Sequence, residues 1–253
     1  MNRIKSLFEQ DKAKIAFITA GDGGLEKSFE VAMALIEGGV NLLEIGVPFS
    51  DPIADGPVIQ RASMRALQHG TSLQDVLQLV TRIRLHTNIP LILFSYFNPI
   101  LSVLGSSFIA DAKQSGIDGI LIVDCPFEEM SDFREQCLAH SIAPIYVITP
   151  STSNNRIRKI NQHAKGFLYY ACRAGTTGVR DTLPIDLIEK IKLIKSISTL
   201  PVVVGFGIAN SEMSQCVLEH ADGVVVGSRI VQAMEENKQA HELKCLAQTI
   251  FAR

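Results

Sequence analysis

The sequence lacks the long apolar runs and the basic clusters that would indicate a membrane protein or a nucleic-acid-binding protein. No apolar run approaches the roughly 20 residues that a membrane span needs. The net charge of the 253 residues is −2 and the pI is about 6.3, so we expect no nucleic acid and no membrane surface as a partner. The N-terminus also lacks an apolar signal core, and we therefore expect a cytoplasmic protein.

Cysteine and histidine are scarce where a metal site or a nucleophilic triad would need them. The five cysteines are an odd number without a CxxC pair, which argues against structural zinc and a disulfide framework and favours free thiols. The six histidines all lie in or beside segments that we expect to be helical, away from predicted strand ends. The sequence therefore argues against a histidine-ligated metal and against a Ser-His-Asp triad, and we expect no metal.

Eight short apolar runs, rich in Ile, Val and Leu, recur along the chain. They cover residues 14–20, 42–48, 90–97, 119–124, 144–150, 167–172, 201–207 and 223–228. Such near-continuous runs are typical of parallel strands that are covered on both faces. Segments with helical periodicity lie between them; in one of these, Ser72 precedes Asp75 by three residues, as at a capped helix start.

The alternation of strands and helices predicts right-handed βαβ units. Eight such units predict an α/β fold with one TIM-barrel domain, a (β/α)₈ barrel over residues 1–253. A short N-terminal helix and a short extra helix after the eighth strand complete this prediction. An open doubly wound sheet is the alternative, but the turn after the first strand reads AGDGG and lacks the GxGxxG spacing.

The active site of such a barrel forms at the C-terminal ends of the strands. No lysine lies there, since Lys14 comes at the start of its strand. The chain therefore lacks the desolvated lysine that a Schiff-base aldolase requires. Proton transfer would depend on a carboxylate or a tyrosine. The candidates at or near strand ends are Glu44, Asp55, Asp124, Tyr96 and Tyr169.

Glu44 is a carboxylate inside an apolar strand, and Asp55 follows it in a proline-rich loop. Pointing outward, Glu44 would be buried under a helix without a partner; pointing inward, it would meet the substrate with a raised pKa. Taken singly, Glu44 could equally be a structural carboxylate bonded to loop amides, and Asp55 an ordinary turn residue before glycine. Two carboxylates in different settings favour a division into acid and stabiliser.

Glycines near the ends of the last three predicted strands suggest a phosphate site. Barrels often bind phosphate with the loops after strands seven and eight and the N-terminus of a short helix, here expected to begin at Ser228. Each glycine alone could equally serve a turn. The glycines are Gly175 and Gly178, Gly205 and Gly207, and Gly227. Arg173 and Arg180 flank the first pair and could reach an anion or form surface ion pairs.

Several stretches together resemble the tryptophan synthase alpha chain family over about residues 5–250. They are AGDGG, LEIGVPFSDPIADGPVIQ, SYFNPIL, GILIVDCPFEE, RAGTTG, VGFGI and DGVVVGSRIV. The resemblance implies retro-aldol cleavage of indole-3-glycerol phosphate to indole and glyceraldehyde 3-phosphate, with no metal and no cofactor in this chain. It also implies an α₂β₂ complex in which indole passes to a beta chain that carries pyridoxal phosphate.

The resemblance implies roles for individual residues. Glu44 would transfer protons at indole C3 and at the glycerol 3′-hydroxyl, Asp55 would accept the indole N–H, and Tyr169 matches an active-site tyrosine. The matches to an indole pocket are Phe17, Phe94, Tyr96, Leu121 and Phe206, and those to a phosphate cradle are Gly178, Gly207, Gly227 and Ser228. Thr177 matches a threonine of a mobile loop, and Asp51 and Pro52 match a surface that faces the partner. The pocket residues could equally be plain barrel core.

The chain departs from the family pattern at a few positions. Gly23 replaces a frequent proline, Ala171 and Cys172 replace a common Val-Ser pair, and Cys125 replaces a frequent leucine. These changes bear on loop stiffness and pocket shape but remove no proton donor. Two other functions stay open: a partner that activates the beta chain without turnover of its own, and another phosphate-binding barrel such as a sugar-phosphate isomerase or decarboxylase.

Overall fold

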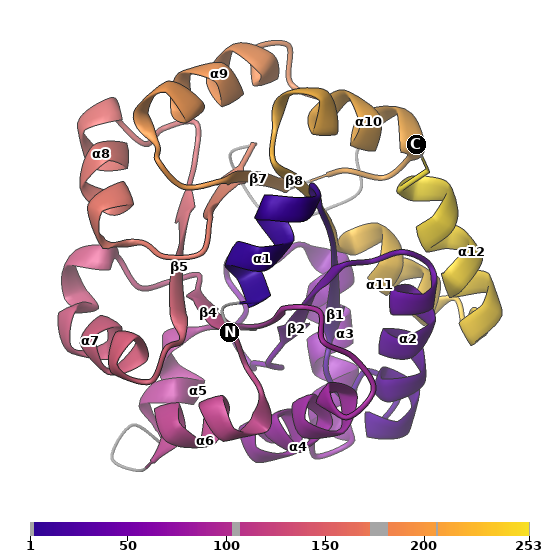
Figure 1. Cartoon of the computed structure of the whole chain (residues 1–253). Helices are drawn as coiled ribbons and strands as arrows, with labels where there is room; N and C mark the ends of the chain where they lie inside the picture. The colour runs from indigo at the N-terminus through magenta and orange to yellow at the C-terminus, as the bar shows by residue number, and fades with distance from the viewer. Residues whose placement is uncertain (1–2, 103–106, 173–181, 206, 253) are drawn as a thin grey trace.

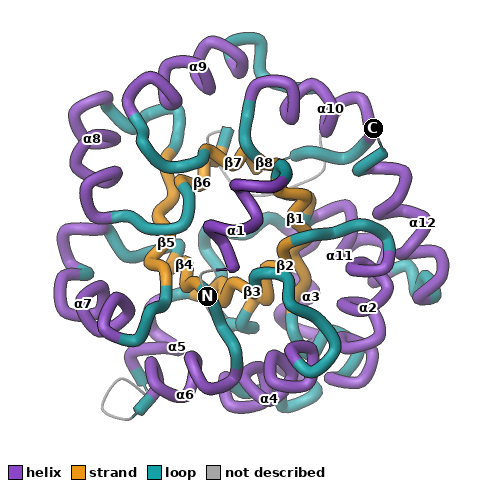
Figure 2. The backbone as a smooth tube through the Cα atoms, viewed as in Figure 1, coloured by secondary structure: helices purple, strands orange, loops and turns teal. Residues whose placement is uncertain are grey.

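The computed structural model describes residues 3–102, 107–172, 182–205 and 207–252 (Figure 1). Eight parallel strands follow one another in chain order around a closed barrel, and β8 pairs with β1 (Figure 2). The strands are β1 (Ala13–Thr19), β2 (Leu42–Gly46), β3 (Leu91–Ser95), β4 (Gly119–Ile122), β5 (Ala143–Ile148), β6 (Leu168–Ala171), β7 (Val202–Gly205) and β8 (Gly223–Val226). The predicted (β/α)₈ barrel is confirmed, and the open doubly wound sheet is wrong.

Helices surround the barrel in both views (Figures 1 and 2). They are α1 (Arg3–Gln10), α2 (Leu25–Glu37), α3 (Pro57–Gln68), α4 (Leu73–Arg84), α5 (Phe97–Leu101), α6 (Phe108–Ser115), α7 (Ser131–Ala139), α8 (Asn154–His163), α9 (Leu187–Ile197), α10 (Ser211–His220), α11 (Ser228–Glu235) and α12 (Ala240–Ile250), with a 3₁₀ turn at Phe127–Glu129. The predicted N-terminal helix is α1 and the predicted extra helix is α11. None of the described helices has the length and apolar character needed to cross a bilayer.

Local sequence signals explain where several helices begin and end. The Ser72 side chain accepts the Asp75 N–H, and Asp75 accepts the Ser72 N–H, so a reciprocal capping box starts α4 as predicted. Pro57 occupies the first position of α3, where a missing N–H costs nothing. Gly116 ends α6 with φ +103°, a conformation that other residues adopt only at a cost.

Side chains on the strands alternate between two apolar layers. On β2, Leu43 and Ile45 lie in the outer layer beneath the helices, whereas Leu42 lies in the barrel interior. Because strand residues alternate, Glu44 shares the inward face with Leu42. Helix α1 crosses the N-terminal end of the barrel, where its Ile4 is fully buried in the interior layer (Figure 1). The opposite end is left for the site.

Candidate active site

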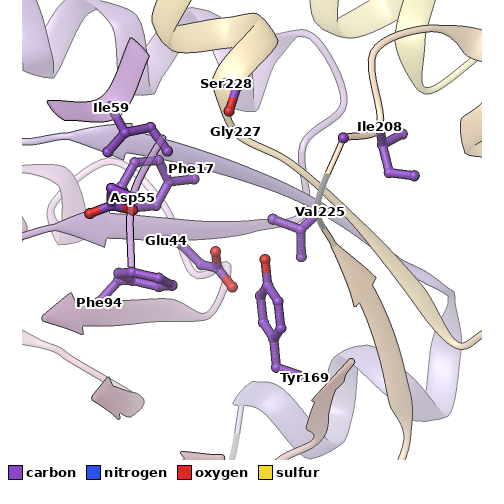
Figure 3. Close-up of a pocket in the computed structure, with 11 residues that line it drawn as sticks. Phe17, Glu44, Asp55, Ile59, Phe94, Tyr169, Ile208, Val225, Gly227 and Ser228 are labelled. Atoms are coloured by element: carbon purple, nitrogen blue, oxygen red, sulfur yellow. The ribbon is translucent and has the colours of Figure 1, made fainter. Parts of the chain in front are cut away.

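A pocket lies toward the C-terminal ends of the strands (Figure 3). Its empty space is about 460 Å³, including the part that opens to solvent. The described residues that line it are Phe17, Glu44, Asp55, Ile59, Phe94, Tyr169, Gly207, Ile208, Val225, Gly227 and Ser228. Strands and loops far apart in the sequence therefore meet at one cavity, with two carboxylates in its wall.

Glu44 is fully buried on β2, next to Phe17 of the neighbouring strand. Its carboxyl group points into the pocket (Figure 3). Neither carboxylate oxygen has a hydrogen-bond partner among the described residues, so the bonds to loop amides that a structural role would require are absent from that part of the chain. Burial raises the pKa of Glu44 to about 8. At neutral pH the group is therefore mainly an uncharged acid.

Asp55 is buried in the loop between β2 and α3, and its carboxylate, unlike that of Glu44, has a hydrogen-bond partner. The hydroxyl of Tyr96 donates to Asp55 Oδ2 at 2.9 Å and accepts the N–H of Ala54 at 2.9 Å. Burial raises the pKa of Asp55 to about 6, against the opposing effect of the Tyr96 hydrogen bond. At pH 7 Asp55 is therefore mainly an anion, while Glu44 in the same pocket is mainly protonated.

Tyr169 enters the pocket from β6, and its hydroxyl points toward the region of Glu44 (Figure 3). Burial, followed by the charges of Glu44 and Cys172, holds the pKa of this phenol well above its usual value, so it stays a neutral donor. The ring is seated against Gly205 of β7, where a Cβ atom would lie 2.2 Å from the Tyr169 hydroxyl. Gly205, which the sequence suggested only as a strand-end glycine, thus makes room for the tyrosine.

Two aromatic rings form one wall of the pocket. Phe17 and Phe94 pack edge to face, with ring centroids 5.1 Å apart and an interplanar angle of 73°. Gly46 allows this packing, because a Cβ atom there would lie 2.5 Å from Phe17 Cζ. A glycine inside a strand often marks such a close approach, so this signal was available in the sequence.

Three further apolar side chains line the pocket and were missed by the sequence reasoning: Ile59, Ile208 and Val225. Strand alternation could have identified Val225, which precedes Gly227 by two residues on β8. Ile59 lies on α3, and no pattern in the sequence shows which helix side chain reaches the barrel mouth. Together with the two rings, these residues make a largely apolar slot.

Some predicted site residues lie elsewhere. The Tyr96 hydroxyl is engaged with Asp55 and the side chain is not among the pocket lining, while Leu121 is fully buried in the barrel interior. Asp124 accepts the Phe97 N–H at 2.7 Å, which supports the start of α5. The remaining predicted residues at this end of the barrel lie outside the described residues. They are Phe206, Arg173, Gly175, Thr177, Gly178 and Arg180.

Gly207, Gly227 and Ser228 line the far side of the pocket, where α11 begins. Gly207 has φ +90°, a conformation that favours glycine. The first N–H groups of a helix have no partner within it and carry the positive end of the helix dipole. This arrangement can hold an anion without a charged side chain, and no Lys, Arg or His occurs among the described lining residues.

The loop with Asp51 and Pro52 extends away from the pocket to the surface. Asp51 is exposed and Pro52 partly so. Beside them lies a surface hollow that includes Ile53, Met64 and Leu67, whose side chains are 77%, 57% and 38% exposed. Exposed apolar groups gathered in this way are typical of an interaction surface. Within the described part of the chain, no three His, Cys, Asp or Glu side chains gather as a metal site.

Comparisons with known proteins agree with this geometry. Residues 4–253 match the family model described as tryptophan synthase alpha chain. The alpha chain of Coxiella burnetii (strain CbuK_Q154) is 53% identical over 250 residues, covering 99% of this chain and 97% of that protein. Among solved structures, the alpha subunit of Legionella pneumophila str. Paris is 38% identical with a TM-score of 0.90, covering 99% and 97% of the two chains. The tryptophan synthase of M. tuberculosis in its aminoacrylate-bound form is 27% identical with a TM-score of 0.88, covering 99% and 98%.

Proposed function

This chain belongs to the tryptophan synthase alpha chain family, and we propose from this premise that Glu44 and Asp55 are the acid–base pair of its lyase reaction. The reaction is the retro-aldol cleavage of indole-3-glycerol phosphate to indole and glyceraldehyde 3-phosphate. The observation that carries the assignment is geometric: both carboxylates line one pocket, where Glu44 has no hydrogen-bond partner among the described residues and Asp55 accepts from Tyr96. Burial separates their pKa values, to about 8 for Glu44 and about 6 for Asp55. Such a separation gives one acid and one anion at neutral pH.

The chemistry follows from these protonation states. The Asp55 anion accepts the indole N–H and stabilises the positive charge that forms when C3 is protonated. Glu44 donates that proton and becomes a carboxylate, which then accepts the proton of the glycerol 3′-hydroxyl. The bond between indole C3 and the glycerol carbon breaks, its electron pair returns to the ring, and the hydroxyl carbon becomes the aldehyde. Glu44 ends the cycle protonated again.

The rest of the pocket fits the two ends of this substrate. The edge-to-face pair of Phe17 and Phe94 supports a slot for the indole ring, with Tyr169 as a neutral hydrogen-bond donor nearby. Gly207, Gly227 and Ser228, at the N-terminus of α11, are the proposed phosphate cradle. Gly178, Phe206 and the loop threonine Thr177 keep their proposed roles from the family resemblance, although they lie outside the described residues.

We further propose that this chain works with a beta chain in an α₂β₂ complex. Asp51 and Pro52, together with the exposed apolar side chains beside them, are the proposed contact surface. Pyridoxal phosphate would belong to the beta chain, and this chain would need no cofactor or metal of its own. The complex would be cytoplasmic, and residues 1–253 would act as one barrel domain.

The release of indole tests this function directly. The purified chain is mixed with indole-3-glycerol phosphate, with and without a beta chain, and indole is measured. We expect indole in both mixtures. No indole in either mixture, with stimulation of the beta chain intact, would instead support a purely activating partner. A chain that neither releases indole nor affects the beta chain would support the alternative of another phosphate-binding barrel enzyme.

A further inference from the structure

Four charged side chains from the loop after β1, α3 and α11 form a connected cluster, which we call the arginine clamp: Asp22, Arg61, Arg65 and Glu235. Arg65 donates from Nε and Nη2 to the two oxygens of Asp22, at 2.7 and 2.9 Å. Its Nη1 donates to Glu235 Oε1 at 2.8 Å. Arg61 donates to both oxygens of Glu235, each at 2.7 Å. The bidentate pairs Arg65–Asp22 and Arg61–Glu235 are therefore linked by the hydrogen bond from Arg65 to Glu235.

The clamp joins the loop after β1 to α3 and α11, two helices that contribute residues to the pocket. Arg61 and Arg65 lie one turn apart on α3, the helix that starts two residues after Asp55. Glu235 is the last residue of α11, whose first residue, Ser228, lines the pocket. The clamp thus connects the helix that follows the acid–base loop with the helix whose N-terminus faces the proposed phosphate site. Figure 1 shows α3 and α11 close to β1, and their ion pairs establish their contact.

Apolar packing between α3 and α11 is confined to the end of the two helices near Phe17. Ile59 and Ala62 of α3 meet Val231 of α11 over Phe17 in one apolar cluster. Ile230, Ala233 and Met234 of α11 are buried in the outer core layer as well, so apolar packing holds the helix on the barrel but has no directional preference of its own. The arginine forks have fixed geometry and are charge-assisted, which makes them suited to fixing a distance and an angle.

The loop after β1, which supplies Asp22, is held by the bond of the Gly21 N–H to Ser28 Oγ and by the clamp. Asp22 lies between Gly21 and Gly23, and these two glycines have φ +83° and φ +77°. Glycine backbones lose the most freedom on ordering, so such a loop needs an anchor. Asp22 is only 3% exposed, and its two bonds to Arg65 supply that anchor. Lys27 of α2 donates to the Met234 carbonyl and thus also holds the C-terminal end of α11.

We propose that Arg65 is a positioning residue, which sets the distance between the acid–base loop and the phosphate cradle so that one substrate molecule can occupy both. Arg65 is not among the lining residues, so it acts through α3 and α11. The inference rests on the proposed function, since it assumes a ligand with an indole ring and a phosphate. Two linked groups bind far more tightly than two separate ones only when the sites have the matching separation.

The test compares whole and divided ligands in a background that cannot turn over. The Glu44→Gln chain, with or without Arg65→Gln, is titrated with indole, with inorganic phosphate and with indole-3-glycerol phosphate. We expect Arg65→Gln to weaken binding of the intact substrate by about 10-fold or more, because a loss of about 1.4 kcal/mol of linkage free energy has that effect. The affinities for indole alone and for phosphate alone should change by less than about twofold, since each subsite stays intact.

Two further variants separate positioning from simple stability. Glu235→Gln keeps the fork between Arg65 and Asp22 but weakens the link to α11, so it should show the same selective loss. Arg156→Gln removes the bidentate pair between α8 and Glu128 of the 3₁₀ turn and should leave all three affinities unchanged. Thermal unfolding of each variant shows whether the chain is folded. If Arg65→Gln does not fold, the comparison is made with Glu235→Gln instead.

A parallel loss of affinity for all three ligands, or no loss for any of them, would overturn the positioning role. If the Glu44→Gln chain without further change fails to bind indole-3-glycerol phosphate, the proposed function fails instead. The two failures are therefore distinguishable in one set of titrations.

Discussion

The hydroxyl of Tyr96 donates to Asp55 Oδ2 at 2.9 Å, and this one contact opposes the effect of burial on the carboxylate. The same hydroxyl accepts the Ala54 N–H, and the Tyr96 ring packs against Phe49 with centroids 5.0 Å apart. Tyr96 therefore holds the loop after β2 from inside and keeps Asp55 charged near neutral pH. The pH dependence of the reaction should consequently depend on a residue outside the pocket lining.

Tyr96→Phe should raise the pKa of Asp55 above about 6, because it removes the hydrogen bond that stabilises the anion. The acidic limb of kcat/KM against pH should move to higher pH, while the ring contact with Phe49 is kept. The substrate phosphate also titrates near pH 6, but an acidic limb that reports the phosphate would lie at the same pH in wild type and in Tyr96→Phe. Tyr170→Phe, in the outer layer of β6, is the matched control. An unmoved limb would show that Asp55 is not the titrating group.

The plot of kcat/KM against pH should be bell-shaped for the wild-type chain. Activity should rise through about pH 6 as Asp55 ionises and fall through about pH 8 as Glu44 loses its proton. Glu44→Gln and Asp55→Asn should each lower activity by at least about 10²-fold, the usual contribution of such groups. Indole release that survives both substitutions would refute the assigned roles.

Glu44 should make the protein less stable as the pH rises. Its pKa is raised from 4.5 to about 8 in the folded state, so between these values the folded chain binds one more proton than the unfolded chain. The stabilisation is complete below about pH 4.5 and is lost as the pH rises through about 8, with a slope of up to about 1.4 kcal/mol per pH unit. Urea unfolding at several pH values should show this slope as the difference between wild type and Glu44→Gln. A difference that does not vary with pH would contradict the raised pKa of the buried Glu44.

Gly205→Ala should impair catalysis through Tyr169. The new Cβ atom would lie 2.2 Å from the Tyr169 hydroxyl, so the ring must move. Overpacking of this kind typically costs about 1–3 kcal/mol of stability. Gly223→Ala is a matched control, because its Cβ atom would lie 2.7 Å from Ala13 Cβ, at the N-terminal end of the barrel. Both variants should unfold at lower urea concentrations, but only Gly205→Ala should lose turnover. Equal turnover in the two variants would show that Tyr169 takes no part in the reaction.

Ile53→Asp should weaken the association with a beta chain and leave the intrinsic cleavage rate of the isolated chain unchanged. Ile53 is 77% exposed beside Asp51, and a charge there would have to be desolvated in an apolar interface. Leu85→Asp provides a control, since Leu85 is similarly exposed, at 79%, directly after α4. Titration of each variant with beta chain measures the effect; equal affinities for the two would place the interface elsewhere.

The barrel could be predicted from the sequence because its determinants are local. Apolar runs of strand length, helical periodicity between them and caps such as Ser72 with Asp75 each depend on neighbouring residues. The inward direction of Glu44 also follows from the alternation of a strand, given the cost of burying an outward carboxylate. The sequence itself therefore determined the barrel and the end of it at which a site is expected, and it offered Glu44 and Asp55 as candidates whose roles stay a prediction.

The tertiary structure decided what surrounds those carboxylates. The protonation state of Asp55 depends on Tyr96, which is 41 residues away in the sequence, and that of Glu44 depends on its burial in the assembled barrel. Ile59 reaches the pocket from a helix, and Arg65 meets Glu235 across 170 residues. Burial and fork geometry are properties of the assembled barrel, since they arise only when segments distant in the chain are brought into contact.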